Sequence, residues 1–238
     1  MKPSKKPSAD FIYTNYQISL NDLKKIKIFF FFSFFLFLLV FFIGALFPVF
    51  FEEKILELIK SLIDQTEEFN VIELIQFIIF NNTRTAFLGM ILGIILGVFP
   101  LSILIINAYI LGFVANKTII SEGLFILWRL LPHGIFEIPA ILISLALGLK
   151  LGIDLMKNSL LYYNKKASPL MLSTLIIISM LIFPIAFFIY LIITFKEKKL
   201  RKTFYNNLVL SLRIFLLIII PLLVVAGFIE GLLIFLLG

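Results

Sequence analysis

An uninterrupted apolar run, Ile28–Phe51, constrains this chain more than any other feature of its sequence. A helix of that length rises about 1.5 Å per residue and reaches roughly 36 Å, more than the hydrocarbon layer of about 30 Å. The run is longer than the apolar core of a cleaved signal peptide, and no small-residue cleavage site follows it. It therefore predicts an uncleaved signal anchor that crosses the membrane.

The composition extends this prediction to the whole chain. Hydrophobic residues make up 61% of the 238 residues and charged residues only 15%, with a mean hydropathy of +1.12. The net charge of +7 lies in short segments between apolar runs, so we expect it to set topology and predict no nucleic-acid partner. With no Cys, the chain has no disulfide framework and no thiolate metal site.

Charge on either side of the first run predicts its orientation. Residues 1–27 carry six Lys and form a cytoplasmic basic tail, because Lys and Arg beside a span resist translocation. Residues 52–70 are acid-rich and are predicted to be extracytoplasmic, within a single transmembrane domain of residues 28–238. Apolar residues recur in this segment at helical spacing, at Leu56, Ile59, Leu62 and Ile63. The pattern fits a helix that lies on the outer membrane face or one that packs against a partner. We expect a multi-pass plasma-membrane protein with a cytoplasmic N-terminus.

The predicted fold is an all-α, polytopic membrane bundle with five spans, or alternatively six, and kinked or broken helices. Residues 71–80 are apolar but too few to cross alone, and they end at the polar cluster Asn81–Thr85. The stretch 86–115 is either one long kinked helix or two short helices that turn near Pro100–Asn107. Five spans keep the basic cluster 196–202 inside, whereas six would move it outside, so charge favours five. The further spans are expected at 123–149, 170–195 and 208–238.

Glycines spaced four apart predict close helix packing, because small residues let backbones approach each other in lipid. The spacing fits contacts within one chain and, alternatively, a homo-oligomer interface. The predicted packing positions are Gly89, Gly93, Gly97, Gly148, Gly152, Gly227 and Gly231.

Two prolines, Pro132 and Pro139, bracket the only His and a Glu within an apolar stretch. Pro132 suits the first turn of a helix, and His133 and Glu137 would then share one face, with Arg129 one turn earlier. Ionised groups in hydrocarbon are costly, so we expect these side chains to face one another, a water-filled cavity or Glu230. The arrangement fits a functional site and equally a buried ion pair that locks helices together.

Catalysis finds little support in the sequence. No second His or Cys completes a metal site with His133 and Glu137, and no Gly-x-Ser-x-Gly elbow or phosphate-binding loop is present. The Asp residues, including Asp154, are expected at or outside span ends, which leaves no aspartyl pair inside a span. We expect no enzyme activity, no cofactor and no metal.

The segment from Pro132 to Glu137, followed by Gly148 and Gly152, resembles the signature of the stage II sporulation protein M family of polytopic membrane proteins. The resemblance covers roughly residues 28–231. The sequence departs from the family pattern at two places. Ala108 stands where family members commonly have Gly, and Gly231-Leu232 follows Glu230 where family members often have Thr-Pro. Further positions in family order are Asn82, Ala86, Gly89, Gly97, Asn107, Gly112, Ala226 and Glu230.

What the resemblance implies is a membrane scaffold, since the family member of sporulating bacteria resembles a scaffold that localises peptidoglycan-degrading partners. Our first hypothesis is therefore a non-catalytic scaffold that binds other membrane or envelope proteins through its acidic outer segment and its glycine faces. The alternative is a transporter or channel-like protein whose polar site comprises Arg129, His133, Glu137 and Glu230, with Asn82 and Asn107 as further polar groups.

Overall fold

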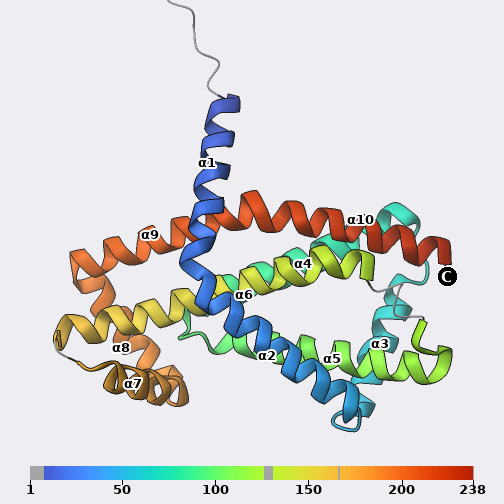
Figure 1. The fold of residues 1–238 in the computed structure, drawn as a ribbon, viewed down its shortest axis with the longest axis horizontal. Helices are drawn as coiled ribbons and strands as arrows, with labels where there is room; N and C mark the ends of the chain where they lie inside the picture. Colours follow the sequence, from blue (N-terminus) through green and yellow to red (C-terminus); the bar gives the residue numbers. More distant parts are fainter. Residues whose placement is uncertain (1–7, 126–130, 166, 238) are drawn as a thin grey trace, which may run out of the picture.

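A computed structural model describes residues 8–125, 131–165 and 167–237, and every secondary-structure element in these ranges is a helix (Figure 1). Five of these helices are long and apolar enough to cross a bilayer, or six if one bent pair counts as a span. The predicted fold class, an all-helical membrane bundle with five or six spans and a broken helix, is confirmed.

The long helices alternate in direction along the chain, so that α2, α5 and α9–α10 run one way and α4 and α6 run the other (Figure 1). The elements are α1 (Ser8–Asp22), η1 (Leu23–Ile26), α2 (Lys27–Leu46), α3 (Glu52–Thr66), α4 (Val71–Ile91), η2 (Leu92–Ile94), α5 (Val98–Glu122), α6 (Leu131–Tyr163), α7 (Pro169–Leu181), α8 (Phe183–Lys196), α9 (Lys198–Ile214), η4 (Phe215–Ile219) and α10 (Ile220–Leu237).

Helix α4 corrects the expectation that residues 71–80 are too short to cross. Asn70 caps this helix: its side chain accepts from the Glu73 backbone N–H while the Glu73 carboxylate accepts from the Asn70 N–H. The helix then continues through the polar cluster Asn81–Thr85 and, with η2, forms one candidate span, Val71–Ile94. A continuous helix pairs its backbone polar groups internally, so polar side chains within it cost less than a broken backbone would.

The stretch 86–115 is neither one kinked helix nor a pair that turns near Pro100–Asn107. The chain reverses earlier, where Leu96 and Gly97 adopt left-handed backbone angles with φ of +52° and +75°. Gly97 takes that conformation without a Cβ penalty. Pro100 then lies in the first turn of α5, where its missing N–H would be unpaired in any case.

The segment 170–195 is a bent pair and not a single straight span. Ser168 caps α7, the helix stops at Ile182, and α8 restarts with Pro184 in its first turn. The two helices are bent by 119° relative to each other. A proline cannot continue the preceding helix, which explains the break.

Helices α4, α6 and α10 pack on one another and form the centre of the bundle. A Cβ added at Gly93 would collide with the backbone of Gly148, one at Gly148 would collide with Gly89, and one at Gly152 would collide with Gly93 and Gly97. The fully buried Ser144 adds a hydrogen bond, because its Oγ donates to the Ala86 carbonyl at 2.6 Å. Helices α4 and α6 therefore run parallel with their backbones in direct contact.

Helix α10 packs antiparallel against α4. A Cβ at Gly227 would meet the Ile79 side chain at 2.5 Å, and one at Gly231 would collide with Ile75. The other main pair is α2 and α5, where Gly44 and Gly112 bring the two backbones together and Asn116 Nδ2 donates to the Ala45 carbonyl at 2.8 Å. The glycines therefore lie at contacts within one chain.

The two ends of the bundle, one with α3 and one with the α7–α8 pair (Figure 1), differ in their balance of charged residues. The end with α3 gathers carboxylates, and the end with α1, the α7–α8 pair and the start of α9 gathers lysines and arginines. The basic residue Lys117 of α5 also lies at the α3 end, where its Nζ is 2.5 Å from Glu52 Oε1. Acidic residues at the α3 end are Glu52, Glu53, Glu57, Asp64, Glu67, Glu68, Glu73 and Glu122, beside the basic Lys54, Lys60 and Lys117. Basic residues at the other end are Lys24, Lys25, Lys27, Lys150, Lys157, Lys165, Lys196, Lys198, Lys199, Arg201, Lys202 and Arg213, beside the acidic Asp10, Asp22, Asp154 and Glu197.

The α4–α6 contact predicts a sharp difference between two Gly→Ala variants. Gly93→Ala places a methyl group in the Gly148 backbone and should destabilise the protein by about 1–3 kcal/mol, as overpacking does. Gly134→Ala is the matched control, because its Cβ would lie 3.6 Å from Ile138 Cδ1, an ordinary contact, and Ala favours a helix. Thermal unfolding in detergent measures both. Equal stability of the two variants would contradict the backbone contact.

The span arrangement predicts which single cysteines react from the same side. Gln65→Cys on α3 and Ser121→Cys at the end of α5 should both react with an impermeant thiol reagent on intact cells. Lys25→Cys and Lys198→Cys should react only after permeabilisation, because the basic end is predicted to be cytoplasmic. The chain has no native Cys, so only the introduced thiol can react with the reagent. Opposite labelling of Gln65→Cys and Ser121→Cys would show that 86–115 crosses the membrane only once.

Candidate functional site

Two carboxyl groups lie on neighbouring helices, where α6 and α10 pack against each other. Glu137 on α6 and Glu230 on α10 are both half-buried, and their side chains are close enough to interact electrostatically. Glu230 Oε2 is buried and has no hydrogen-bond partner among the described residues. This pair lies within two membrane-spanning helices, where each carboxylate needs a donor or a cation nearby.

The other half of the predicted polar cluster is described only in part. Arg129 lies outside the described residues, and so do the side chains of Pro132 and His133. The backbone places Pro132 and His133 in the first turn of α6, with Gly134, Glu137 and Pro139 following in the same helix. The structure therefore fixes the positions of Glu137 and Glu230 relative to each other and leaves their predicted cationic partner undescribed.

The two asparagines of the predicted site lie on different helices. Asn82 is half-buried on α4, which packs on both α6 and α10, and the neighbouring Thr83 Oγ1 is buried without a hydrogen-bond partner among the described residues. Asn107 is exposed on α5, where its Nδ2 donates to the Ile103 carbonyl of its own helix at 2.7 Å. Asn107 thus forms a hydrogen bond within its own helix and does not join the carboxyl pair.

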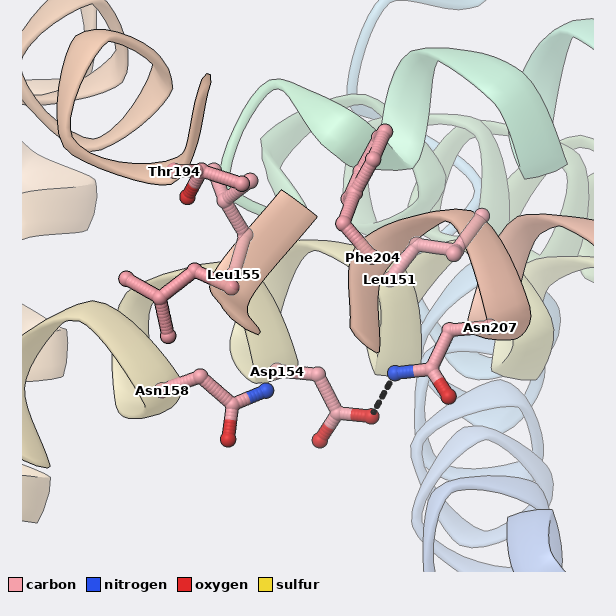
Figure 2. Close-up of a pocket in the computed structure, with 8 residues that line it drawn as sticks. Leu151, Asp154, Leu155, Asn158, Thr194, Phe204 and Asn207 are labelled. Atoms are coloured by element: carbon pink, nitrogen blue, oxygen red, sulfur yellow. Dashed lines mark hydrogen bonds between the residues drawn. The ribbon is translucent and has the colours of Figure 1, made fainter. Parts of the chain in front are cut away.

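A second polar centre, which the sequence reasoning missed, surrounds Asp154. This residue lies in the second half of α6, toward the basic end of the bundle, where the sequence predicts the end of a span. Its carboxylate forms an ion pair with Lys150 one turn earlier and accepts a hydrogen bond from Asn207 Nδ2 of α9 at 3.0 Å. Figure 2 shows Asn158 on the other side of Asp154 from Asn207. The spacing of Lys150 and Asp154, four apart in an apolar stretch, is the signal that could have revealed the pair.

These side chains line a small cleft between α6, α8 and α9 (Figure 2). Its free volume of about 10 Å³ is close to the space of one water molecule. Ser159 on α6 and Thr194 on α8 form a buried hydrogen bond of 3.2 Å beside it. The cleft is lined by Leu151, Asp154, Leu155, Asn158, Thr194, Leu200, Phe204 and Asn207. The centre therefore joins the bent α7–α8 pair and α9 to α6, and its carboxylate is already neutralised by Lys150.

Helix α3 forms an acid-rich surface at the opposite end. One face carries apolar side chains, of which Ile55 is buried, and the other face exposes Glu53, Glu57 and Asp64 together with a single basic residue, Lys60. Helical periodicity separates the two faces, as in helices that lie at a membrane interface. The helix packs little on the other helices, and the Glu52–Lys117 ion pair ties its first turn to α5.

The described residues contain no group of three His, Asp or Glu side chains that could hold a metal ion. The first polar centre consists of the carboxyl groups of Glu137 and Glu230, and the second combines the Lys150–Asp154 ion pair with amide and hydroxyl groups of α6, α8 and α9.

The chain resembles known proteins in two comparisons. The family model for stage II sporulation protein M matches residues 33–233. An uncharacterized protein of Methanocaldococcus jannaschii is 33% identical over 120 residues, covering 46% of this chain and 52% of that protein. The chain thus aligns with about half the length of this relative. No solved structure matches the chain at a significant level.

The family match covers most of the chain and includes the glycine contacts, the segment Pro132–Pro139 and Glu230. This protein belongs to the stage II sporulation protein M family.

Proposed function

We propose that this protein is a non-catalytic scaffold of the plasma membrane that binds other membrane or envelope proteins through the acid-rich surface of α3. The observation that carries the proposal is that α3 exposes Glu53, Glu57 and Asp64 while packing little on the rest of the bundle. A helix that exposes its charged face is available to a partner with a basic surface.

The polarity of the bundle supports this assignment. Carboxylates gather at the α3 end and basic residues at the opposite end, which the positive-inside rule assigns to the cytoplasm. The acidic surface then faces the cell envelope. Complementary charge chiefly speeds encounter and sets orientation, which suits a protein that positions partners.

The centre of the bundle also supports a scaffold. Glycine contacts hold α4 against α6 backbone to backbone. A packed centre supplies a rigid platform, whereas a transport cycle needs one group of helices to move against another.

Removing the charge of the acid-rich surface should abolish partner binding without affecting the fold. In cells that carry a photoreactive amino acid at Leu58, the triple variant Glu53→Gln/Glu57→Gln/Asp64→Asn should reduce cross-linked partner several-fold. All three side chains are exposed, so the free energy of unfolding should change by less than about 0.5 kcal/mol. Glu67→Gln/Glu68→Gln, just beyond α3, is the control and should retain cross-linking. Equal cross-linking by the triple variant would refute the proposed surface.

One observation favours a transporter as the second candidate: Glu137 and Glu230 lie close together inside the bundle, and Glu230 Oε2 is unpaired among the described residues. Carboxyl groups at depth on facing helices are how transporters bind ions.

Glu137→Gln separates the two candidates. The amide keeps the hydrogen-bonding capacity and nearly the size of the carboxyl group, so the free energy of unfolding should fall by no more than about 1 kcal/mol. If the protein is a scaffold, cross-linking through α3 stays unchanged. In a transporter, cation-driven flux in proteoliposomes is present for the unmodified chain and lost in Glu137→Gln, while Glu122→Gln at the exposed end of α5 keeps it. Flux that depends on Glu137 would replace the scaffold proposal.

A further inference from the structure

A cleft lies where the N-terminal helices meet α6, and neither polar centre described above uses it. It is lined by Leu23, Lys24, Ile26, Lys27, Phe30 and Ile143. Its volume is about 290 Å³, and only carbon atoms line its walls. Lys24 and Lys27 therefore contribute their aliphatic stems to the walls, as lysines do at membrane interfaces.

The cleft lies at the boundary between polar and apolar parts of the chain. Lys27 is the last charged residue before the apolar length of α2, whose remaining residues, Ile28–Leu46, carry no charge. Ile143 forms the opposite wall and precedes Ser144, which is tied to the α4 backbone. The cleft thus has one wall in the bundle core and its lysines at the level expected for lipid headgroups.

Local ion pairs leave these two lysines without a carboxylate. The side chain of Asp22 is nearly buried and binds Lys25 at 2.8 Å and Arg213 at 3.7 Å. Among the described residues no acidic side chain pairs with Lys24 or Lys27, and Lys27 Nζ lies 5.9 Å from the ring centroid of Phe31. The site therefore combines an apolar cleft with two uncompensated positive charges.

We propose that this cleft binds an anionic phospholipid, with an acyl chain in the carbon-lined space and the phosphate between Lys24 and Lys27. The bilayer around the protein supplies such lipids, and basic pockets between membrane helices are suited to anionic headgroups. A zwitterionic lipid offers the same acyl chain but no net negative charge for the lysines. The bound lipid joins η1 and the start of α2 to α6.

The experiment measures lipid binding to the purified full-length chain by native mass spectrometry, with phosphatidylglycerol and phosphatidylcholine of identical acyl chains. The unmodified chain should prefer phosphatidylglycerol by roughly fivefold for each lysine, the effect of one basic residue at a charged membrane surface. Lys24→Gln/Lys27→Gln should remove the preference. Lys198→Gln/Lys199→Gln is the matched control, because it removes two exposed lysines at the same end of the bundle and should keep the preference.

A second variant tests the apolar part of the site. Ile143→Trp should fill the cleft and reduce binding of both lipids several-fold while Lys24 and Lys27 remain. Circular dichroism and elution volume check that each variant is folded. Soluble glycerol phosphate should not compete, because it lacks the acyl chain.

Three results would overturn the proposal. The first is an equal loss of preference in the Lys24/Lys27 and Lys198/Lys199 variants, which would indicate diffuse attraction. The second is unchanged lipid binding by folded Ile143→Trp. The third is full competition by glycerol phosphate, which would indicate a simple phosphate site.

Discussion

The backbone contact between α4 and α6 is the constraint on which the rest of the structure depends. Hydrophobic burial cannot draw two apolar helices together in lipid, so close approach and a few hydrogen bonds must do so. Gly89 on α4 and Gly93 on the following η2 face Gly148 and Gly152 on α6, and the bond from Ser144 to Ala86 fixes their register. With α4 and α6 parallel and joined in this way, α10 packs antiparallel beside both, and Glu137 comes to lie near Glu230.

Hydropathy predicts the class of fold well and the position of each break poorly. The apolar run of α2 could be read directly, because its length exceeds the bilayer. The start of α4 was also readable, since Asn70 and Glu73 form a capping box, but the polar cluster in mid-helix concealed the span that follows. The reversal at Leu96 and Gly97 has no strong local signal, because only the left-handed backbone angles of these residues reveal it.

The candidate sites, like the fold, could be predicted from the sequence only in part. The cost of charge in hydrocarbon predicts that Glu137 needs a nearby polar group, but a single sequence cannot say which glycine contacts bring Glu230 to it. Lys150 and Asp154 were readable as a pair at helical spacing, whereas Asn207 reaches Asp154 only because the long helix α9–α10 packs on α6. The basic residues of the N-terminal helices and of α9 lie at one end of the bundle, and the positive-inside rule predicts that this end is cytoplasmic.

The register of α4 on α6 tests this account most directly, because the span arrangement and the placement of both polar centres depend on it. The pair Ala86→Cys and Ser144→Cys lies across the hydrogen bond of 2.6 Å, in a chain that has no other Cys. We predict that this pair forms an intramolecular disulfide rapidly in membranes under mild oxidation. The control pair Ala86→Cys and Asn158→Cys should form none, because Asn158 lies several turns further along α6. Cross-linking of Ala86→Cys to Asn158→Cys, with none to Ser144→Cys, would contradict the parallel glycine contact.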